Sequence, residues 1–252
     1  MASANVTDLY RVTSPPAACS YLPVETCQMD YRICGDLEAA NFGELLRRGW
    51  RRFGTHVFRP ACPLCRKCRP IRVVVEDFQL SKSQRRTLRK NEHIAVTIQP
   101  PSVSWEHVRL YDAYHADMAE RRDWPHKTTT PEEYFESFIG GKFEFAREIL
   151  YWNDERLVGV GLVDITPLGL SSAYFFHDPD WRPLGPGTFS ALMEIEYARQ
   201  QGLPHVYLGF WISENQSMAY KSRYEPHELL QSFVGDRDEP QWHLVAPTTI
   251  GG

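Results

Sequence analysis

The sequence of 252 residues lacks a long apolar run. Apolar runs such as residues 71–75, which Arg72 interrupts, are far shorter than the roughly 20 residues that a membrane-spanning helix needs. The first 23 residues also lack a basic segment followed by an apolar one, which is the pattern of a secretory signal. We therefore expect a cytoplasmic protein without a membrane partner.

Cysteine is absent from the last two thirds of the chain. All six cysteines precede residue 69, whereas a secreted disulfide framework usually staples the whole of a small chain. We therefore expect reduced thiols or a metal site. With 42% hydrophobic and 24% charged residues, the composition is that of a globular protein that folds as one large domain or two small ones.

Acidic residues are scarce in residues 47–91. This basic segment has fourteen Lys and Arg residues against two acidic ones, a net charge of +12 in a chain whose formal net charge is −4. Because Lys and Arg release counterions from phosphates, such segregation predicts a face that binds a polyanion. A solvated face without a partner is the alternative, but Trp50, Phe53 and Phe58 interleave with the charges, which favours a folded nucleic-acid surface.

The hydrophobic pattern predicts alternating helices and strands after an irregular arm at residues 1–18. The expected helices are residues 37–50, 81–91, 105–121 and 188–201, with another from Thr130, and the expected strands are residues 71–78, 95–99, 143–151, 157–165, 171–177 and 205–212. This order is typical of an α+β fold, an α/β mixture with mostly antiparallel sheets flanked by helices. Residues 99–102, with two prolines, form the predicted boundary between domains at residues 1–98 and 99–252.

Cys62, Cys65 and Cys68 follow one another at intervals of three residues. Thiolates at this spacing can wrap a soft cation such as zinc. The candidates for a fourth ligand are Cys19, Cys27 and Cys34. Iron–sulfur proteins share the rhythm, although the usual downstream cysteine is missing here. Buried, inert thiols are the alternative.

Arg182, Gly185 and Gly187 stand in the order R-x-x-G-x-G. This spacing resembles the pyrophosphate loop of GCN5-related N-acetyltransferases, where glycines let the backbone approach an anion at a helix N-terminus. A plain turn is the alternative. The position between a predicted strand and an amphipathic helix favours the anion-binding interpretation.

Three further residues are candidates for catalysis. Asp178 follows a predicted strand, which is a suitable place for a general base. Tyr220 and Lys221 lie in a polar, cationic segment of an otherwise acidic half. Lys221 and the nearby Arg223 are suited to bind a carboxylate or a phosphate. Surface side chains without a role are the alternative.

Several blocks of sequence resemble the bacterial aspartate/glutamate leucyltransferases, relatives of the eukaryotic arginyl-tRNA–protein transferases. The resemblance covers nearly the whole chain, and its blocks are residues 19–23, 47–54, 58–60 with the cysteine loop, 81–91, 169–172, 178–180, 207–212 and 218–221. Cys27 and Cys34 lie outside the family pattern. Gly185-Pro-Gly187 also departs from the G-T-Y that the family usually has there.

The resemblance implies transfer of leucine from leucyl-tRNA to the α-amine of proteins that begin with Asp or Glu, which marks them for degradation by the N-degron (N-end rule) pathway. It also implies two GCN5-related N-acetyltransferase-like halves, the first with the cysteine-rich and basic region. An aminoacyl ester is already activated, so holding ester and amine together supplies much of the acceleration. No cofactor is then required for the chemistry, in agreement with the lack of any triad-like constellation.

The resemblance and the residue types together give each element an expected role. The residues expected to bind tRNA are Ser81, Ser83, Gln84, Arg85, Arg86, Arg89, Arg182, Gly185 and Gly187. Those expected to bind the acidic acceptor are Arg48, Trp50, Arg51, Arg52 and Arg223, with Lys221. A leucyl or adenosine pocket would use Trp50, Phe53, Tyr207 and Trp211. The thiols expected to hold a zinc ion or an iron–sulfur cluster are Cys19, Cys62, Cys65 and Cys68.

Three alternative functions stay open from the residues. The same reaction with arginyl-tRNA as donor fits equally well. A coenzyme A-dependent N-acetyltransferase would explain residues 182–187 but not the basic segment. A non-enzymatic, metal-stabilised RNA-binding module would explain the basic segment but leaves residues 99–252 without a role.

Overall fold

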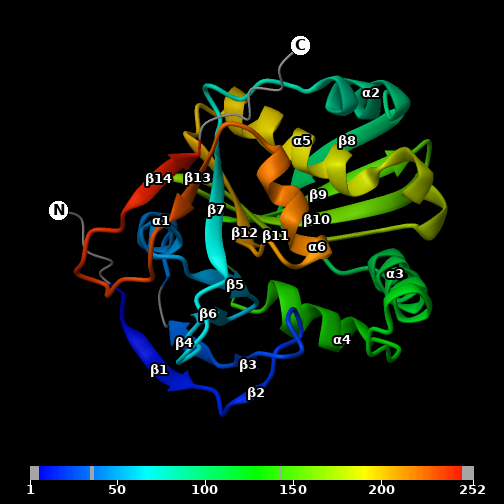
Figure 1. The fold of residues 1–252 in the computed structure, drawn as a ribbon. Coiled ribbons are helices and arrows are strands. Elements are labelled where there is room, and N and C mark those ends of the chain that lie inside the picture. Colours follow the sequence, from blue (N-terminus) through cyan, green and yellow to red (C-terminus); the bar gives the residue numbers. More distant parts are fainter. Residues whose placement is uncertain (1–5, 35–36, 142, 246–252) are drawn as a thin grey trace.

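The computed structural model describes residues 6–34, 37–141 and 143–245. An eight-stranded sheet in the order β14-β13-β7-β12-β11-β10-β9-β8 forms its centre (Figure 1). The strands are β7 Arg69–Val74, β8 Ile94–Gln99, β9 Ala146–Asn153, β10 Arg156–Thr166, β11 Gly169–His177, β12 His205–Trp211, β13 His227–Leu230 and β14 Trp242–Val245. All neighbours are antiparallel except β11 and β12, which are parallel. The predicted α+β class with mostly antiparallel sheets is confirmed.

A small sheet in the order β1-β4-β6-β5 comes from the first sixty residues and is antiparallel throughout. Its strands are β1 Asp8–Thr13, β4 Met29–Cys34, β5 Arg51–Phe53 and β6 His56–Pro60, and β2 Ala17–Ala18 pairs separately with β3 Thr26–Cys27. The predicted arm is wrong for residues 8–13, because β1 pairs with β4 from Asp8↔Cys34 to Thr13↔Asp30.

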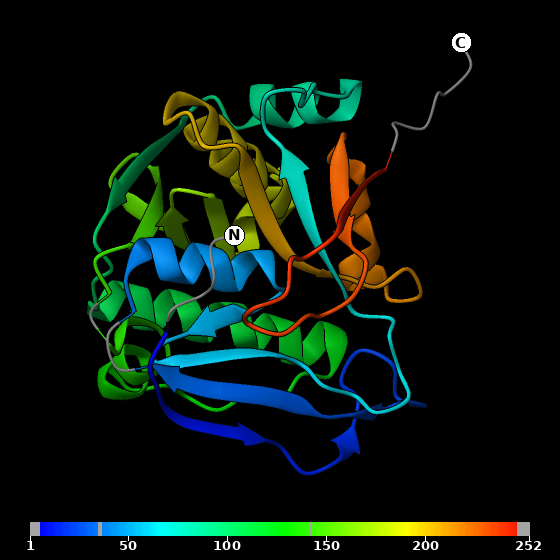
Figure 2. The same cartoon turned by 90° about the vertical axis from the view of Figure 1, so that its left-hand side faces the viewer.

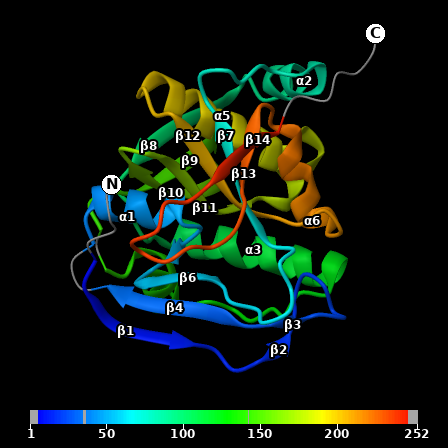
Figure 3. The ribbon, with the colours of Figure 1, turned by 60° about the vertical axis from the view of Figure 1, so that its left-hand side comes forward.

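Helices cover both faces of the large sheet. They are α1 Ala39–Arg47, α2 Lys82–Lys90, α3 Trp105–Arg122, α4 Pro131–Tyr134, α5 Pro186–Gln200 and α6 Gln216–Ala219, with single-turn elements η1 Phe135–Ile139, η2 Pro179–Leu184 and η3 Tyr220–Arg223. Figure 2 and Figure 3 show α1 and α3 between the large sheet above and the small sheet below. The helix α5 covers the other face, with α2 packed beside it (Figure 1). None of the described helices is long and apolar enough to cross a membrane.

The alternation of side chains along β10 explains why both faces are covered. Val160 and Leu162 pack with Val108 of α3 in one apolar cluster. Val163 follows a register shift and packs with Ile195 of α5 in another. A strand buried on both faces has apolar residues at consecutive positions, and this is the pattern by which the sequence predicted it.

The predicted basic helix is confirmed as α2. Ser81 Oγ accepts a hydrogen bond from the Gln84 backbone N–H at 3.2 Å, and the Gln84 side-chain oxygen accepts from the Ser81 N–H at 2.8 Å. This reciprocal capping box satisfies two donors that a helix start leaves free. The exposed cations of the helix are Lys82, Arg85, Arg86, Arg89 and Lys90.

The basic segment as a whole does not form one exposed face. Arg48, Arg51, Arg52 and Arg59 are at most 9% exposed. The guanidinium of Arg52 pairs with Asp164 of β10 at 2.5 Å and lies over the ring of Phe143, 4.9 Å from its centroid. The prediction of a single polyanion-binding face is therefore wrong for these four arginines, because they lie between layers and bind internal carboxylates and carbonyls.

Strands from both sides of the predicted domain boundary share the large sheet. The segment of residues 1–98 contributes β7 and most of β8, and residues 99–252 contribute the six other strands. The division at residues 98 and 99 stays a prediction.

The Arg52–Asp164 pair yields a test of how the two sheets are joined. Asp164 is fully buried, so Asp164→Asn leaves a buried guanidinium without its counterion. We expect a loss of about 3–5 kcal/mol in the free energy of unfolding, measured in urea. Glu133→Gln, which removes the exposed partner of Lys127, is the control and should cost less than about 1 kcal/mol. Equal losses in the two variants would show that the buried pair does not hold the sheets together.

Candidate active site

The parallel strands β11 and β12 separate soon after they meet. Their pairing is limited to Leu170↔Val206 and Ser171↔Tyr207, although the strands have nine and seven residues. Beyond those pairs the two strands are not paired with each other, and we call the space between their backbones the opening. Carbonyl groups on its edges need donors from elsewhere, because an unsatisfied buried carbonyl is costly.

Arg51 supplies donors to both edges of this opening. Its side chain reaches from β5 of the small sheet and donates to the Tyr207 carbonyl of β12 at 3.2 Å and to the Ser172 carbonyl of β11. Burial lowers the pKa of Arg51 to about 10, which still leaves the guanidinium charged at neutral pH. A fixed positive charge therefore lies in the opening.

Glu194 of α5 lies near Arg51 and interacts with its charge. The residue is 1% exposed, and its Oε1 accepts a hydrogen bond from Ser172 Oγ at 3.1 Å. Its Oε2 has no hydrogen-bond partner among the described residues. Burial raises the pKa of Glu194 to about 7, and this exceeds the opposing effects of Ser172 and Arg51. The carboxyl group can therefore gain or lose a proton near neutral pH.

Lys221 completes the cluster from η3. Its Nζ donates to the Phe210 carbonyl of β12 at 3.0 Å and lies 3.2 Å from Met218 Sδ. Burial, together with the charge of Arg51, lowers the pKa of Lys221 to about 7. Gly209 has a φ of +84° and lies beside Lys221 Nζ and Arg51, so the bulged backbone can approach both cations.

Two tyrosines lie near the carboxylate. Burial raises the pKa of Tyr220 to about 12, and the charge of Glu194 adds to this effect. Tyr151 donates its hydroxyl proton to Ser190 Oγ at 2.9 Å, one turn before Glu194 on α5. Glu194 and Lys221, by contrast, have pKa values moved toward neutrality, and such groups gathered together are typical of sites that transfer protons.

The structure brings together two of the three residues predicted as catalytic. Tyr220 and Lys221 belong to the cluster. Asp178 lies six residues along β11 from Ser172, about 20 Å away in an extended strand. It caps η2 by accepting the Asp180 N–H at 2.9 Å and pairs with Arg156. Its carboxylate oxygens thus have structural partners outside the opening.

The two predicted tRNA-binding elements are neighbours. Asn91, at the end of α2, donates to the Leu184 carbonyl and accepts from Trp181 Nε1, at 2.9 and 2.7 Å. Gly185 has a φ of +75° and comes directly before α5, and apart from its chain neighbours and the backbone of its own helix no described atom lies within 4 Å of where a Gly187 Cβ would stand. Exposed arginines of α2 and an open helix start therefore lie side by side, although Gln84 is buried in its capping box.

The residues predicted for acceptor binding are dispersed. Arg48 is 1% exposed and pairs with Glu44 at 2.6 Å. Trp50 is fully buried, with the Arg59 guanidinium 4.3 Å from its ring centroid. Arg223 is exposed beside α2, where its carbonyl accepts from Gln84 Nε2 at 3.3 Å. Of the predicted set, Arg51 and Lys221 are the cations that lie at the opening.

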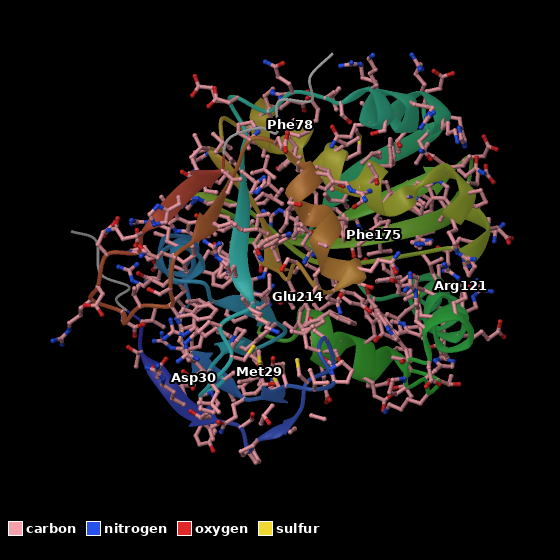
Figure 4. The ribbon with its side chains drawn as sticks, in the orientation of Figure 1. Met29, Asp30, Phe78, Arg121, Phe175 and Glu214 are labelled. Carbon is pink, nitrogen blue, oxygen red and sulfur yellow. The ribbon has the colours of Figure 1, made fainter. Side chains whose placement is uncertain are left out.

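All six cysteines are free thiols. The Cys27 thiol contacts those of Cys19 and Cys62, and burial with neighbouring thiols raises the pKa of Cys68 to about 12. Sulfur atoms gather above Met29 in Figure 4. Within the described ranges no three His, Cys, Asp or Glu side chains have the geometry to hold a metal ion. As placed, the thiols do not fit a metal, and the zinc or iron–sulfur cluster stays a prediction.

Glu194 and Tyr151 did not come out of the sequence patterns, and Ser172 was part of a family block but had no expected role. A signal for Glu194 was present, since it follows Ser190 by one turn in a helix whose apolar stripe contains Ala191, Ile195 and Ala198. A carboxylate within an apolar stripe is buried unless the helix end frays. Its role in the site depends on the strand separation, which no local pattern reveals.

Family models identify the class of protein to which this fold and site belong. The model for the C-terminus of arginine-tRNA-protein transferase matches residues 106–231, and the model for its N-terminus matches residues 17–86. The chain is therefore a transferase.

Curated relatives identify the group within that class. An aspartate/glutamate leucyltransferase of Helicobacter hepaticus is 35% identical over 231 residues, 92% of this chain and 96% of that protein. One of Campylobacter jejuni is 36% identical over 84% of this chain and 89% of that protein, and one of Acinetobacter baumannii is 36% identical over 88% and 82%. The chain belongs to the aspartate/glutamate leucyltransferase family.

Solved structures resemble the chain only weakly. FemX covers 63% of this chain and 58% of its own length, with a TM-score of 0.45 and 9% identity. L-PGS from Bacillus licheniformis covers 68% and 50%, with a TM-score of 0.44 and 13% identity. Neither likeness contributes to the functional conclusions.

The buried carboxyl group of Glu194 predicts a pH effect on stability. Because the folded-state pKa of about 7 exceeds the ordinary value of 4.5, this group stabilises the fold below pH 4.5, and that stabilisation is lost as the pH rises through 7. We expect Glu194→Gln to remove a decline on the order of 3 kcal/mol between those limits. Urea unfolding at pH 5 and pH 8 measures the difference.

Glu196→Gln is the matched control for this measurement, because Glu196 lies on the same helix with an exposed side chain. Its free energy of unfolding should change between pH 5 and pH 8 by the same amount as that of the wild type. Parallel curves for Glu194→Gln as well would mean that Glu194 titrates in the folded protein at its ordinary pKa.

Proposed function

We propose that this chain transfers leucine from leucyl-tRNA to the N-terminal α-amine of proteins that begin with Asp or Glu, at the opening between β11 and β12. The identity of 35% to an aspartate/glutamate leucyltransferase over 92% of the chain supports the reaction. The cluster of Arg51, Glu194 and Lys221 supports this opening as the location of the reaction. The products would enter the N-degron pathway, in the cytoplasm, where charged tRNA is found.

The reaction is the aminolysis of an ester. The acceptor α-amine attacks the carbonyl carbon of the leucyl ester, a C–N bond forms, and the C–O bond to the ribose breaks. The starting ammonium loses one proton before attack and a second as the amide forms, and the departing ribose oxygen takes up a proton. A base with a pKa near 7 and a hydroxyl donor are therefore suited to the reaction.

Glu194 and Tyr220 match these two requirements. Glu194 Oε2 lacks a hydrogen-bond partner among the described residues, and its carboxylate form is available at and above pH 7 to accept a proton from the ammonium. The Tyr220 hydroxyl retains its proton at neutral pH and can donate it to the departing oxygen. Arg51 stays charged and limits the build-up of negative charge in the opening.

Lys221 is suited to select acidic acceptors. In the free protein its amine is held near a pKa of 7 by burial. An incoming Asp or Glu carboxylate favours the charged ammonium and raises that pKa again. The ion pair then forms only with an acidic first residue, whereas a basic one would meet both Lys221 and Arg51.

Arginine as the transferred residue is the second candidate, because the matching family models carry the name of arginine-tRNA-protein transferase. Purified protein is incubated with radiolabelled Leu-tRNA or Arg-tRNA and with peptides that begin with Asp, Glu, Lys or Ala. We expect label from Leu-tRNA in the Asp and Glu peptides alone. Label from Arg-tRNA instead would identify arginyl-tRNA as the donor. No transfer from either tRNA by folded protein would favour an acetyl-coenzyme A-dependent reaction, which a binding measurement with acetyl-coenzyme A would test.

The exposed face of α2 yields a prediction about tRNA binding. Replacing Arg85, Arg86 and Arg89 with alanine should weaken binding, and the slope of log K against log salt should fall by about 2–3, because each phosphate contact contributes about 0.7–0.9. Binding is measured by filter retention between 50 and about 300 mM salt. Arg122→Ala with Arg237→Ala is the control, since both side chains are exposed outside α2. An unchanged slope in the triple variant would show that α2 does not bind the tRNA phosphates.

A further inference from the structure

One face of the small sheet carries a row of aromatic side chains. Register pairs Tyr31 of β4 with Phe58 of β6, and Phe58 with Arg51 of β5, so these three residues are cross-strand neighbours. Phe53 follows Arg51 by two residues and shares its face. Ring centroids are 6.2 Å apart for Tyr31 and Phe58 and 5.3 Å apart for Phe53 and Phe58. We call Tyr31, Phe53 and Phe58, together with Met29 and His56, the aromatic platform.

A second wall faces the platform across a cavity of about 480 Å³. Tyr111 of α3, Phe138 of η1 and Tyr174 of β11 line this wall. Phe138 and Tyr174 are stacked with centroids 5.5 Å apart, and Phe53 meets both rings edge-on. Met29, on the platform side, and Phe175, on the opposite face of β11 near α5, are labelled in Figure 4. The cavity thus lies between the small sheet and the large one.

Register places Arg51, the fixed cation of the proposed transfer site, opposite Phe58, which lines the cavity. Along β5, Arg51 and Phe53 point to the same side. Along β11 the register shifts between Ser172 and Tyr174, so Ser172 faces Glu194 of α5 whereas Tyr174 packs in the cluster on the α3 face. Arg51 contacts Ser172, and Phe53 contacts Tyr174 with ring centroids 5.9 Å apart. Phe53 of the aromatic platform therefore lies about 7 Å from Arg51, two residues along β5. A ribose spans a similar separation between its base and an ester on its 2′ or 3′ oxygen.

We infer that the aromatic platform stacks the terminal unpaired base of the tRNA acceptor end, and that Phe53 sets the position of the leucyl ester; this rests on the proposed function. Single-stranded RNA is commonly recognised by aromatic side chains on a sheet surface, because every base presents a flat π-face. A leucyl side chain is far smaller than the cavity and gains nothing specific from aromatic rings. The phosphates of the same strand then continue toward charged side chains outside the cavity.

The first test uses Phe53, whose side chain is 36% exposed and whose replacement leaves the cores intact. Phe53→Leu keeps the side chain apolar and removes the ring. We expect the KM for Leu-tRNA to rise roughly tenfold or more, the amount that stacking of one base contributes. The KM for an Asp-peptide should stay unchanged, and Phe53→Trp should restore the wild-type KM for Leu-tRNA. Trp105→Leu, at a 70% exposed aromatic on α3, is the control and should have no effect.

The second test measures binding without catalysis. Adenosine 5′-monophosphate, cytidine 5′-monophosphate and leucinamide are titrated separately into the wild type and Phe53→Leu, with binding followed by NMR shifts of the aromatic protons. We expect adenosine monophosphate to shift Tyr31, Phe58 and Tyr174 and to lose affinity severalfold in the variant. Shifts caused by leucinamide alone, and lost in the variant, would assign the cavity to the leucyl group and overturn the inference.

The outcomes separate this inference from the proposed function. Leucine transfer by the wild type with an unchanged KM in Phe53→Leu would overturn the role of the platform and leave the reaction in place. Absence of transfer by the wild type, together with Phe53-dependent binding of adenosine monophosphate, would overturn the reaction and support base stacking.

Discussion

The double hydrogen bond from Arg51 to the carbonyls of Ser172 and Tyr207 is the interaction on which the site depends. Two parallel strands that separate within the sheet leave backbone acceptors facing a gap, and one planar guanidinium satisfies an acceptor on each side. Because Arg51 comes from β5, the same bond docks the small sheet against the large one. Arg51 therefore both joins the two sheets and supplies the positive charge of the site.

Burial is what most changes the titration of the groups around Arg51. Burial moves the pKa of Glu194 up and that of Lys221 down, and both arrive at about 7. Burying a carboxyl group and an amine lowers the stability of the fold, whereas apolar residues at the same positions would not. Proteins accept such a cost where proton transfer near neutral pH is needed. The arrangement is thus typical of an active site, as we propose for this cluster.

The elements with clear periodicity could be predicted from the sequence, and the small sheet could not. The capping box at Ser81 and the apolar runs of β9 to β11 follow local rules. In β5 and β6, buried arginines at positions 51, 52 and 59 break the alternation by which strands are recognised, so these strands stayed hidden. Tyr220 and Lys221 came from sequence blocks, whereas Glu194 depends on the separation of β11 and β12, a tertiary feature without a local signal.

The most direct test of the account is the single-turnover rate of leucine transfer from pre-bound Leu-tRNA to an Asp-peptide, measured from pH 5.5 to 9 for the wild type and Glu194→Gln. The account predicts a wild-type rate that rises with pH and levels off above about pH 7, and a variant that is slower by about 10²–10⁴ and lacks this inflection. Equal rates with the same pH profile would contradict the assignment of proton transfer to Glu194 at the opening between β11 and β12.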